Sequence, residues 1–231
     1  MKKYEFTGKT KEYCGVILKQ IRRIEDNLIG GWIESEENLS QEGLCFVFDN
    51  AIVYNKAQVF NNAKVYDNAR IYDDARISGN AEVFDNAQIY GNAVVSGNAT
   101  ICDNTKVFEN AKISDNAGIW NDAEIYGDAK VSDDARIHDQ ARVCSNVEVS
   151  DDARVYNDMI INCKFKDFHY YSFFKGKPIT ALLCEDDIWR FNIGCQDLLT
   201  KDEFIQRIEE EDGGLKENPH RKKYLRILNI Y

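Results

Sequence analysis

Aspartate recurs at intervals of eighteen residues in this chain of 231 residues. The positions are Asp49, Asp67, Asp85 and Asp103. Carboxylates brought to equivalent places would repel one another, and a calcium ion, which prefers oxygen ligands, could relieve that repulsion. Aspartates at corners of a chain also accept hydrogen bonds from nearby backbone N–H groups. We expect this second role, and the sequence predicts neither a metal nor a cofactor.

Cysteine and histidine, the other side chains that commonly carry out catalysis, form no recognisable motif. The seven cysteines are scattered without a C-x-x-C pair, which indicates reduced thiols in the cytoplasm rather than disulfides or a zinc site. Of the three histidines, His169 and His220 lie outside the repeats described next, and His138 lies in an outward-facing column. Cys102 and Cys144 also face outward without a histidine beside them in sequence. We therefore predict no catalytic residue.

The elements that position these side chains follow a period of six. From Val53 to Ile161 every sixth residue is Val or Ile, nineteen in succession. Ala stands two residues earlier except at Thr105, Val147 and Met159. A fixed period of this length predicts a solenoid of stacked strands, whereas an amphipathic helix would need a period of 3.6. Ala and Val/Ile share the inner side of each strand, and Asp, Asn and Gly form the corners.

A longer period of eighteen is visible in the residue after each Val/Ile, so that three hexads make one coil with three faces. One face carries Phe60 followed by serines from Ser78 to Ser150. The other two carry large rings, which could stabilise strand pairing or mark a docking surface. The candidate binding residues on the first ring-bearing face are Tyr66, Phe84, Trp120 and Tyr156. Those on the second are Tyr54, Tyr72, Tyr90, Phe108 and Tyr126.

This pattern resembles the hexapeptide-repeat family. The resemblance implies a mainly β fold, a triangular, left-handed parallel β-helix of about six coils. It also implies a homo-oligomer, since proteins of this family are often trimers. Members that are acyltransferases usually have a histidine base and a loop between coils. Here the period is uninterrupted, which argues against that activity. Members of the carbonic-anhydrase type need three histidine ligands, and a single repeat histidine cannot supply them.

The two ends of the chain lack the repeat. We expect an N-terminal β cap over 1–45, the β-helix over 46–164 and a small α+β domain over 165–231. Trp32 is the expected lid of the first end. In the last domain the sequence predicts a hairpin of 179–184 and 188–195, a helix starting at the capping box of Thr200 and ending near 211, and a further helix after Asn218-Pro219. The layout resembles uncharacterised hexapeptide-repeat proteins of prophages and phages. The segments that carry this resemblance are 30–34, 39–43 and 193–195.

Charge narrows the choice of function. The net charge is −10, and residues 45–165, with 11 basic and 19 acidic side chains, contribute −8. Such a surface repels nucleic acid and anionic membranes, so we expect neither as a direct partner. The favoured hypothesis is a non-enzymatic interaction protein that binds itself or a host protein. The alternative is an acyltransferase or small-molecule-binding protein with a site between subunits, and a weaker one is an acidic mimic of nucleic acid.

Overall fold

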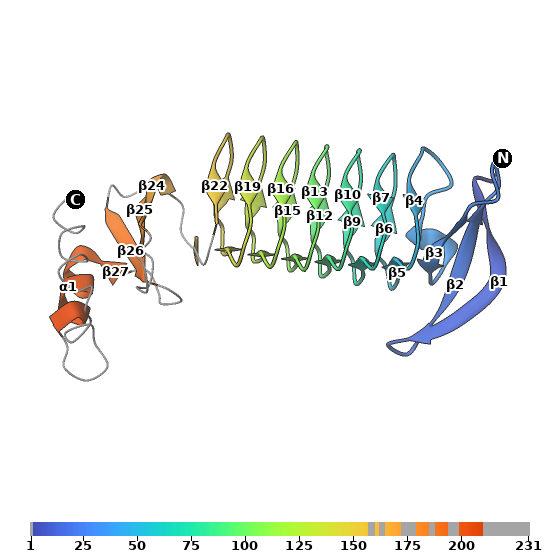
Figure 1. Ribbon diagram of the computed structural model, residues 1–231, viewed down its shortest axis with the longest axis horizontal. Helices are drawn as coiled ribbons and strands as arrows, with labels where there is room; N and C mark the ends of the chain where they lie inside the picture. Colours follow the sequence, from blue (N-terminus) through green and yellow to red (C-terminus); the bar gives the residue numbers. More distant parts are fainter. Residues whose placement is uncertain are drawn as a thin grey trace. The chain divides into compact units, whose positions relative to one another are not determined.

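The structure is a computed structural model that describes residues 2–156, 160–161, 165–171, 179–184, 188–193 and 199–209. The chain forms two compact units, Met1–Asn157 and Asp158–Tyr231 (Figure 1). Among the described residues, no helix is long and apolar enough to cross a membrane.

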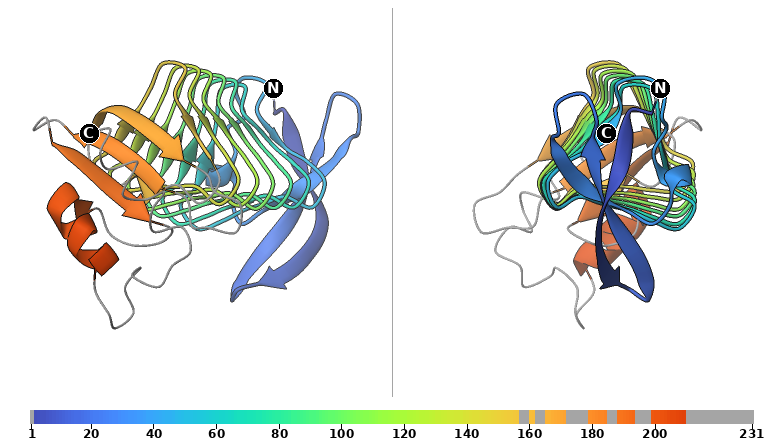
Figure 2. Two further views of the ribbon diagram at one scale, coloured as in Figure 1. Left: turned by 60° about the vertical axis from the view of Figure 1, so that its left-hand side comes forward. Right: turned by 90° about the vertical axis from the view of Figure 1, so that its right-hand side faces the viewer.

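The first unit is a parallel β-solenoid whose strands are two residues long and begin every six residues, in agreement with the expected fold. Seen along the axis, successive coils superimpose (Figure 2). The strands form three faces, which we name A, B and C. Face A contains β5 (Ile52–Val53), β8 (Arg70–Ile71), β11 (Gln88–Ile89), β14 (Lys106–Val107), β17 (Glu124–Ile125) and β20 (Arg142–Val143). Face B contains β6 (Gln58–Val59), β9 (Arg76–Ile77), β12 (Val94–Val95), β15 (Lys112–Ile113), β18 (Lys130–Val131) and β21 (Glu148–Val149). Face C contains β4 (Phe46–Val47), β7 (Lys64–Val65), β10 (Glu82–Val83), β13 (Thr100–Ile101), β16 (Gly118–Ile119), β19 (Arg136–Ile137) and β22 (Arg154–Val155).

The solenoid forms because each part of the hexad performs one physical task. The Ala and Val/Ile columns are almost completely buried and fill the interior. The residue that begins each corner has a positive φ, for example 56° at Asp67 and 68° at Gly97, a conformation that Asp, Asn and Gly tolerate best. Backbone N–H groups then donate to the next coil, as in the 2.9 Å bond from Gln88 N to Thr105 O. Equivalent residues of neighbouring coils therefore lie in register, eighteen positions apart.

An antiparallel hairpin precedes the solenoid and joins its ladder. Strands β1 (Tyr4–Tyr13) and β2 (Val16–Arg23) pair with each other, and β2 pairs with β3 (Ile29–Ile33). β3 in turn lies parallel to β5, so the hairpin continues face A. Gly31 is required at this junction, because a Cβ atom there would lie 2.6 Å from the carbonyl oxygen of Ala51.

The end of the solenoid is closed differently from the sequence prediction. Ile33 points inward and is fully buried, so Trp32, its neighbour on the strand, lies on the outer side against the Leu18 cluster and is not the lid. Tyr4 is buried at this end instead, and its hydroxyl donates to the carbonyl oxygen of Leu39 at 2.8 Å. The 3-10 helix η1 (Glu36–Asn38) places the fully buried Asn38 beside it.

The second unit contains β23 (Ile160–Ile161) and an antiparallel sheet in the order β24-β25-β26-β27. Its strands are β24 (Phe165–Tyr171), β25 (Ile179–Cys184), β26 (Trp189–Ile193) and β27 (Leu199–Thr200), followed by α1 (Lys201–Glu209). The predicted hairpin is confirmed by the pairing of β25 with β26. The capping box is confirmed as well, because Glu203 N donates to Thr200 Oγ1 at 3.3 Å and Thr200 N donates to Glu203 Oε2 at 2.7 Å. The predicted last helix lies outside the described residues.

Candidate interaction surface

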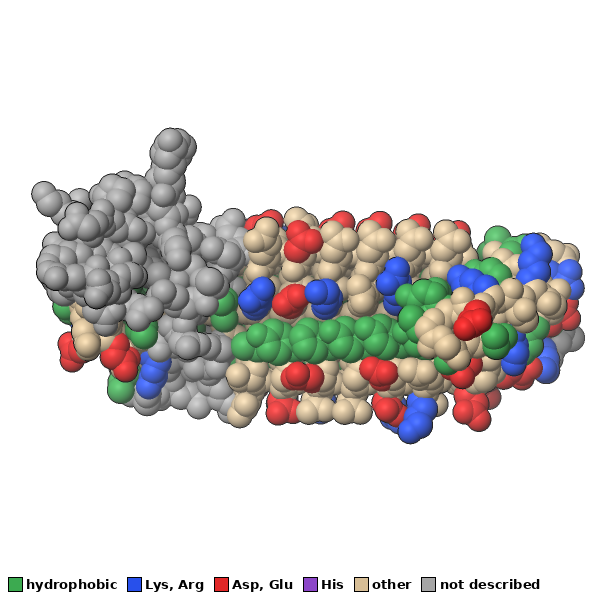
Figure 3. Space-filling view, turned by 90° about the horizontal axis from the view of Figure 1, so that it is seen from below, with side chains coloured by type: hydrophobic (Ala, Val, Ile, Leu, Met, Phe, Trp, Pro, Cys, Tyr) green, Lys and Arg blue, Asp and Glu red, His purple; other side chains and the backbone are tan. Residues whose placement is uncertain are grey.

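Five rings form one continuous row on face A, which we call stripe A. They are Tyr54, Tyr72, Tyr90, Phe108 and Tyr126. Successive ring centroids are 4.8 to 5.2 Å apart and the rings are nearly parallel, with interplanar angles between 2° and 14°. A continuous apolar row is visible along this side of the solenoid (Figure 3). The sequence prediction that these residues share one face is therefore correct.

Stacking determines which parts of the rings a partner can reach. Each inner ring of stripe A has a neighbour on both faces, as at Tyr90, whose ring centroid lies 4.8 Å from that of Tyr72 and 5.0 Å from that of Phe108. These distances lie in the range for offset-stacked rings. The ring edges, and not the ring faces, therefore point outward. Edges carry partial positive charge and favour contact with ring faces and with oxygen acceptors.

The N-terminal hairpin already occupies the first position of stripe A. Tyr13 lies 5.8 Å from Tyr54 at an angle of 76°, and Leu18 is fully buried in the same cluster. The guanidinium of Arg70 lies 5.7 Å from the centre of the Tyr13 ring. Tyr54 retains only 8% of its exposure, whereas the rings from Tyr72 onward remain partly exposed. Stripe A thus has a covered beginning and an open continuation.

Burial of the tyrosine hydroxyls changes their acidity. Desolvation is the main reason that the pKa of Tyr72 and of Tyr126 is raised to about 12. Neighbouring groups add to the effect, namely Tyr90 at Tyr72 and the thiol of Cys144 at Tyr126. Like a tyrosine with the ordinary pKa of 10.0, these residues carry a protonated hydroxyl at neutral pH, and the shift extends this state to more alkaline pH.

The rings of face C form a second row, stripe C, which is interrupted. Tyr66 stacks on Phe84 at 4.8 Å, and Trp120 stacks on His138, which stacks on Tyr156. Cys102 occupies the column between Phe84 and Trp120. The sequence placed all of these residues on one face correctly, and only the stacking distances show that the row consists of two separate groups.

His138 is a member of stripe C. Its ring lies 5.0 Å from that of Trp120 and 5.6 Å from that of Tyr156. Its Nδ1 lies 3.1 Å from Asp139 Oδ2. This arrangement agrees with the expected surface role.

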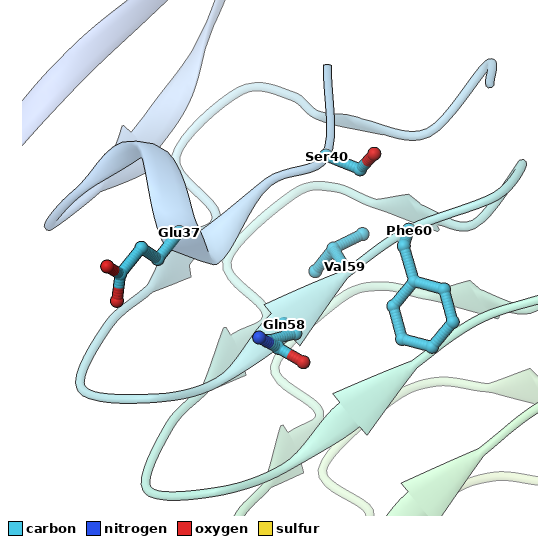
Figure 4. Close-up of a pocket in the computed structure, with 5 residues that line it drawn as sticks. All are labelled: Glu37, Ser40, Gln58, Val59 and Phe60. Carbon is cyan, nitrogen blue, oxygen red and sulfur yellow. The ribbon is translucent and has the colours of Figure 1, made fainter. Parts of the chain in front are cut away.

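Face B is polar. Ser114 and Ser132 donate to the carboxylates of the aspartates that follow them, at 2.7 and 3.2 Å. Phe60 heads this serine column and borders an open pocket of about 230 Å³. The pocket lies where the chain leaves η1 and passes β6, and it is also lined by Glu37, Ser40, Gln58 and Val59 (Figure 4).

The corner aspartates bind backbone N–H groups of neighbouring coils, as expected. Asp49 accepts from Asp67 N at 3.4 Å, and Asp103 accepts from Asn121 N at 2.9 Å. Ligand atoms of Asp85, Cys102 and Asp103 also lie within 4.8 Å of one another. Desolvation and these two carboxylates raise the pKa of the Cys102 thiol to about 12.

Amide ladders are present on the outer corners. In one of these ladders, each side-chain amide donates a hydrogen bond of 2.9 to 3.2 Å to the side-chain oxygen of the equivalent residue in the next coil, and the last acceptor is a carboxylate. Its members are Asn62, Asn80, Asn98, Asn116 and Asp134.

Two residues have structural roles that were not predicted from the sequence. Asn38 is held by four hydrogen bonds in the cap, and the Ser35-x-x-Asn38 spacing before it was a capping signal that could have revealed it. Gly118 is the only glycine in the column before Val/Ile, and a Cβ atom there would lie 2.7 Å from Cζ3 of Trp120. Gly118 therefore makes room for the indole.

Comparison with known families agrees with this architecture. The pattern of the YdcK beta-solenoid repeat matches residues 63–79, 69–83 and 87–104. The matched residues all lie within the solenoid, so the chain is similar to a family of repeat β-solenoid proteins in that part. No curated protein matches the chain.

Proposed function

We propose that this protein is a non-enzymatic interaction protein that binds a protein partner through the open part of stripe A. The partner is a second copy of the chain or a host protein. A cytoplasmic location and a prophage setting are part of the same proposal, the first from the free thiols and the second from the layout of the sequence.

The observation that carries the proposal is that stripe A continues beyond the segment that covers it. The hairpin buries Tyr54 by bringing Tyr13 and Leu18 against it. The same kind of surface continues through Tyr90 and Phe108, which remain partly exposed. A continuous apolar row of this kind is a common mark of a protein interface.

The polar neighbours of stripe A support recognition rather than unspecific adhesion. Glu124 forms ion pairs with two neighbours, through Oε1 to Lys106 Nζ at 3.0 Å and through Oε2 to Arg142 Nε at 3.4 Å. Charged side chains therefore border the rings in a fixed arrangement. A polar rim around an apolar centre is the usual composition of a specific interface.

The proposal is tested with a variant in which Tyr90 and Phe108 are both replaced by serine, the residue that face B carries at the same position. We expect wild-type protein to self-associate in sedimentation measurements or to capture a defined protein from bacterial lysate, and the variant to lose that binding. Ser96→Ala on face B serves as the matched control and should bind like the wild type. Equal binding by the wild type and the double variant would contradict the proposal.

A further inference from the structure

Stripe C lacks one ring, and the gap has the dimensions of a ring. Phe84 is stacked on Tyr66 and Trp120 on His138, so each has one ring face directed toward the coil of Cys102. Two steps of strand spacing place these rings roughly 9.6 Å apart. A planar group inserted midway would lie about 4.8 Å from each, the spacing found between Tyr66 and Phe84.

The walls of this slot leave space for such a group. Its floor is Cys102, whose side chain is far smaller than the rings above and below it in the column. On one flank lies Thr100, a small residue on the strand of the same coil as Cys102. On the other flank are the corner residues Asp85 and Asp103.

The slot is electrostatically negative. Asp85 and Asp103 contribute to the raised pKa of the Cys102 thiol, which shows that their charges act on the floor of the slot. Among the described side chains that border it, none is cationic. Lys64, two coils before the slot, is bound to Glu82, with 2.9 Å between Nζ and Oε1.

The two carboxylates can bind a further donor. Asp103 N donates to Asp85 Oδ2 at 3.4 Å, and Asn121 N donates to Asp103 Oδ2 at 2.9 Å. The hydrogen bonds that the described residues make to these carboxylates use Oδ2 of each. Their Oδ1 atoms take part in none of these hydrogen bonds and can accept from a further donor.

A guanidinium group matches each of these features. It is planar, permanently charged and rich in N–H donors, and it stacks on aromatic faces. An ammonium group has the charge but is not planar, and a neutral ring is planar but has no charge.

We propose that the slot between Phe84 and Trp120, with Cys102 as its floor, binds the guanidinium of an arginine side chain on a partner protein. The proposal rests on the proposed function for the source of the arginine, but not for the binding itself.

The test is an NMR titration of the full chain with N-acetylarginine amide, followed at the Trp120 indole resonance, which is assigned with Trp120→Phe. The lysine and citrulline analogues are the comparison ligands, because they remove the plane and the charge respectively. We expect the arginine ligand to shift the Trp120 resonance and to bind about tenfold more tightly than either analogue. Equal binding of the three would overturn the proposal.

Two variants test the location. Cys102→Tyr supplies the missing ring and should abolish the arginine-dependent shift, whereas Cys144→Tyr, which extends stripe A by one ring, should leave it unchanged. Asp103→Asn retains a residue that tolerates positive φ, so it keeps the fold and should weaken binding about fivefold. Undiminished binding of arginine to Cys102→Tyr or to Asp103→Asn would refute the slot.

The outcomes also separate the two proposals. If the arginine ligand binds but no protein partner is found, the proposed function is refuted and the slot is retained. If a partner binds stripe A and the arginine ligand does not bind, the slot is refuted and the proposed function is retained.

Discussion

Replacing Asn38 by alanine should open the N-terminal end of the solenoid. The Asn38 side chain is completely buried. Its Nδ2 donates to the carbonyl oxygens of Asn55 and Ala57, both at 2.9 Å. Its Oδ1 accepts from the backbone N–H groups of Glu34 and Ser35, at 3.1 and 2.9 Å. One side chain therefore connects η1 and the end of β3 to the first regular coil.

The expected cost follows from these four hydrogen bonds. Each contributes roughly 0.5–1.5 kcal/mol net, so their loss should lower the free energy of unfolding by about 2–6 kcal/mol. Asn38→Asp should be at least as damaging at neutral pH, because a carboxylate keeps the two acceptor contacts but faces two carbonyl oxygens. That repulsion raises the pKa of the new carboxyl group in the folded state. The Asp variant should therefore regain stability as the pH falls through this raised pKa, and the recovery should be complete at about pH 4, where the carboxyl group of the unfolded chain is also protonated.

Urea denaturation measures the global change, and hydrogen exchange of the amides in β1, β2 and η1 reports local opening of the cap. Asn98→Ala is the matched control, because Asn98 is an exposed member of an amide ladder with one bond on each side. It should cost less than about 1 kcal/mol. The reasoning is refuted if Asn38→Ala and Asn98→Ala lose similar stability and the cap amides exchange as in the wild type.

Three other predictions concern the interior, the stripes and acidity. Thr105→Val should raise the free energy of unfolding by about 1 kcal/mol in urea titrations, because Thr105 Oγ1 is buried and has no hydrogen-bond partner among the described residues; a decrease would contradict this. Gly118→Ala should displace the Trp120 indole and change its NMR resonance, and an unchanged resonance would contradict this prediction. The pKa of Tyr72 and of Tyr126 is raised from 10.0 to about 12 on folding. The corresponding stability is complete below pH 10 and is lost as the pH rises toward 12, so the denaturation midpoint should fall over this range while tyrosinate absorbance appears late.

The sequence by itself determined the solenoid and the contents of its faces. An unbroken spacing of six residues places Ala and Val/Ile inside every strand, and the eighteen-residue period brings equivalent side chains together by simple translation along the axis. Stacked rings, amide ladders and corner aspartates all follow from this regular register. They were predictable because each depends only on residues at a fixed interval.

The tertiary structure alone decided which parts of these faces remain available. Several contacts join the repeats to segments that lack the six-residue period. They are the docking of Tyr13 and Leu18 on Tyr54, the outward position of Trp32 and the buried hydrogen bonds of Asn38. The gap at Cys102 became a slot only when the ring stacking on both sides of it was known. The physical reason is that a repeat fixes contacts between equivalent residues, whereas contacts with the non-repetitive cap depend on side-chain packing that no local pattern encodes.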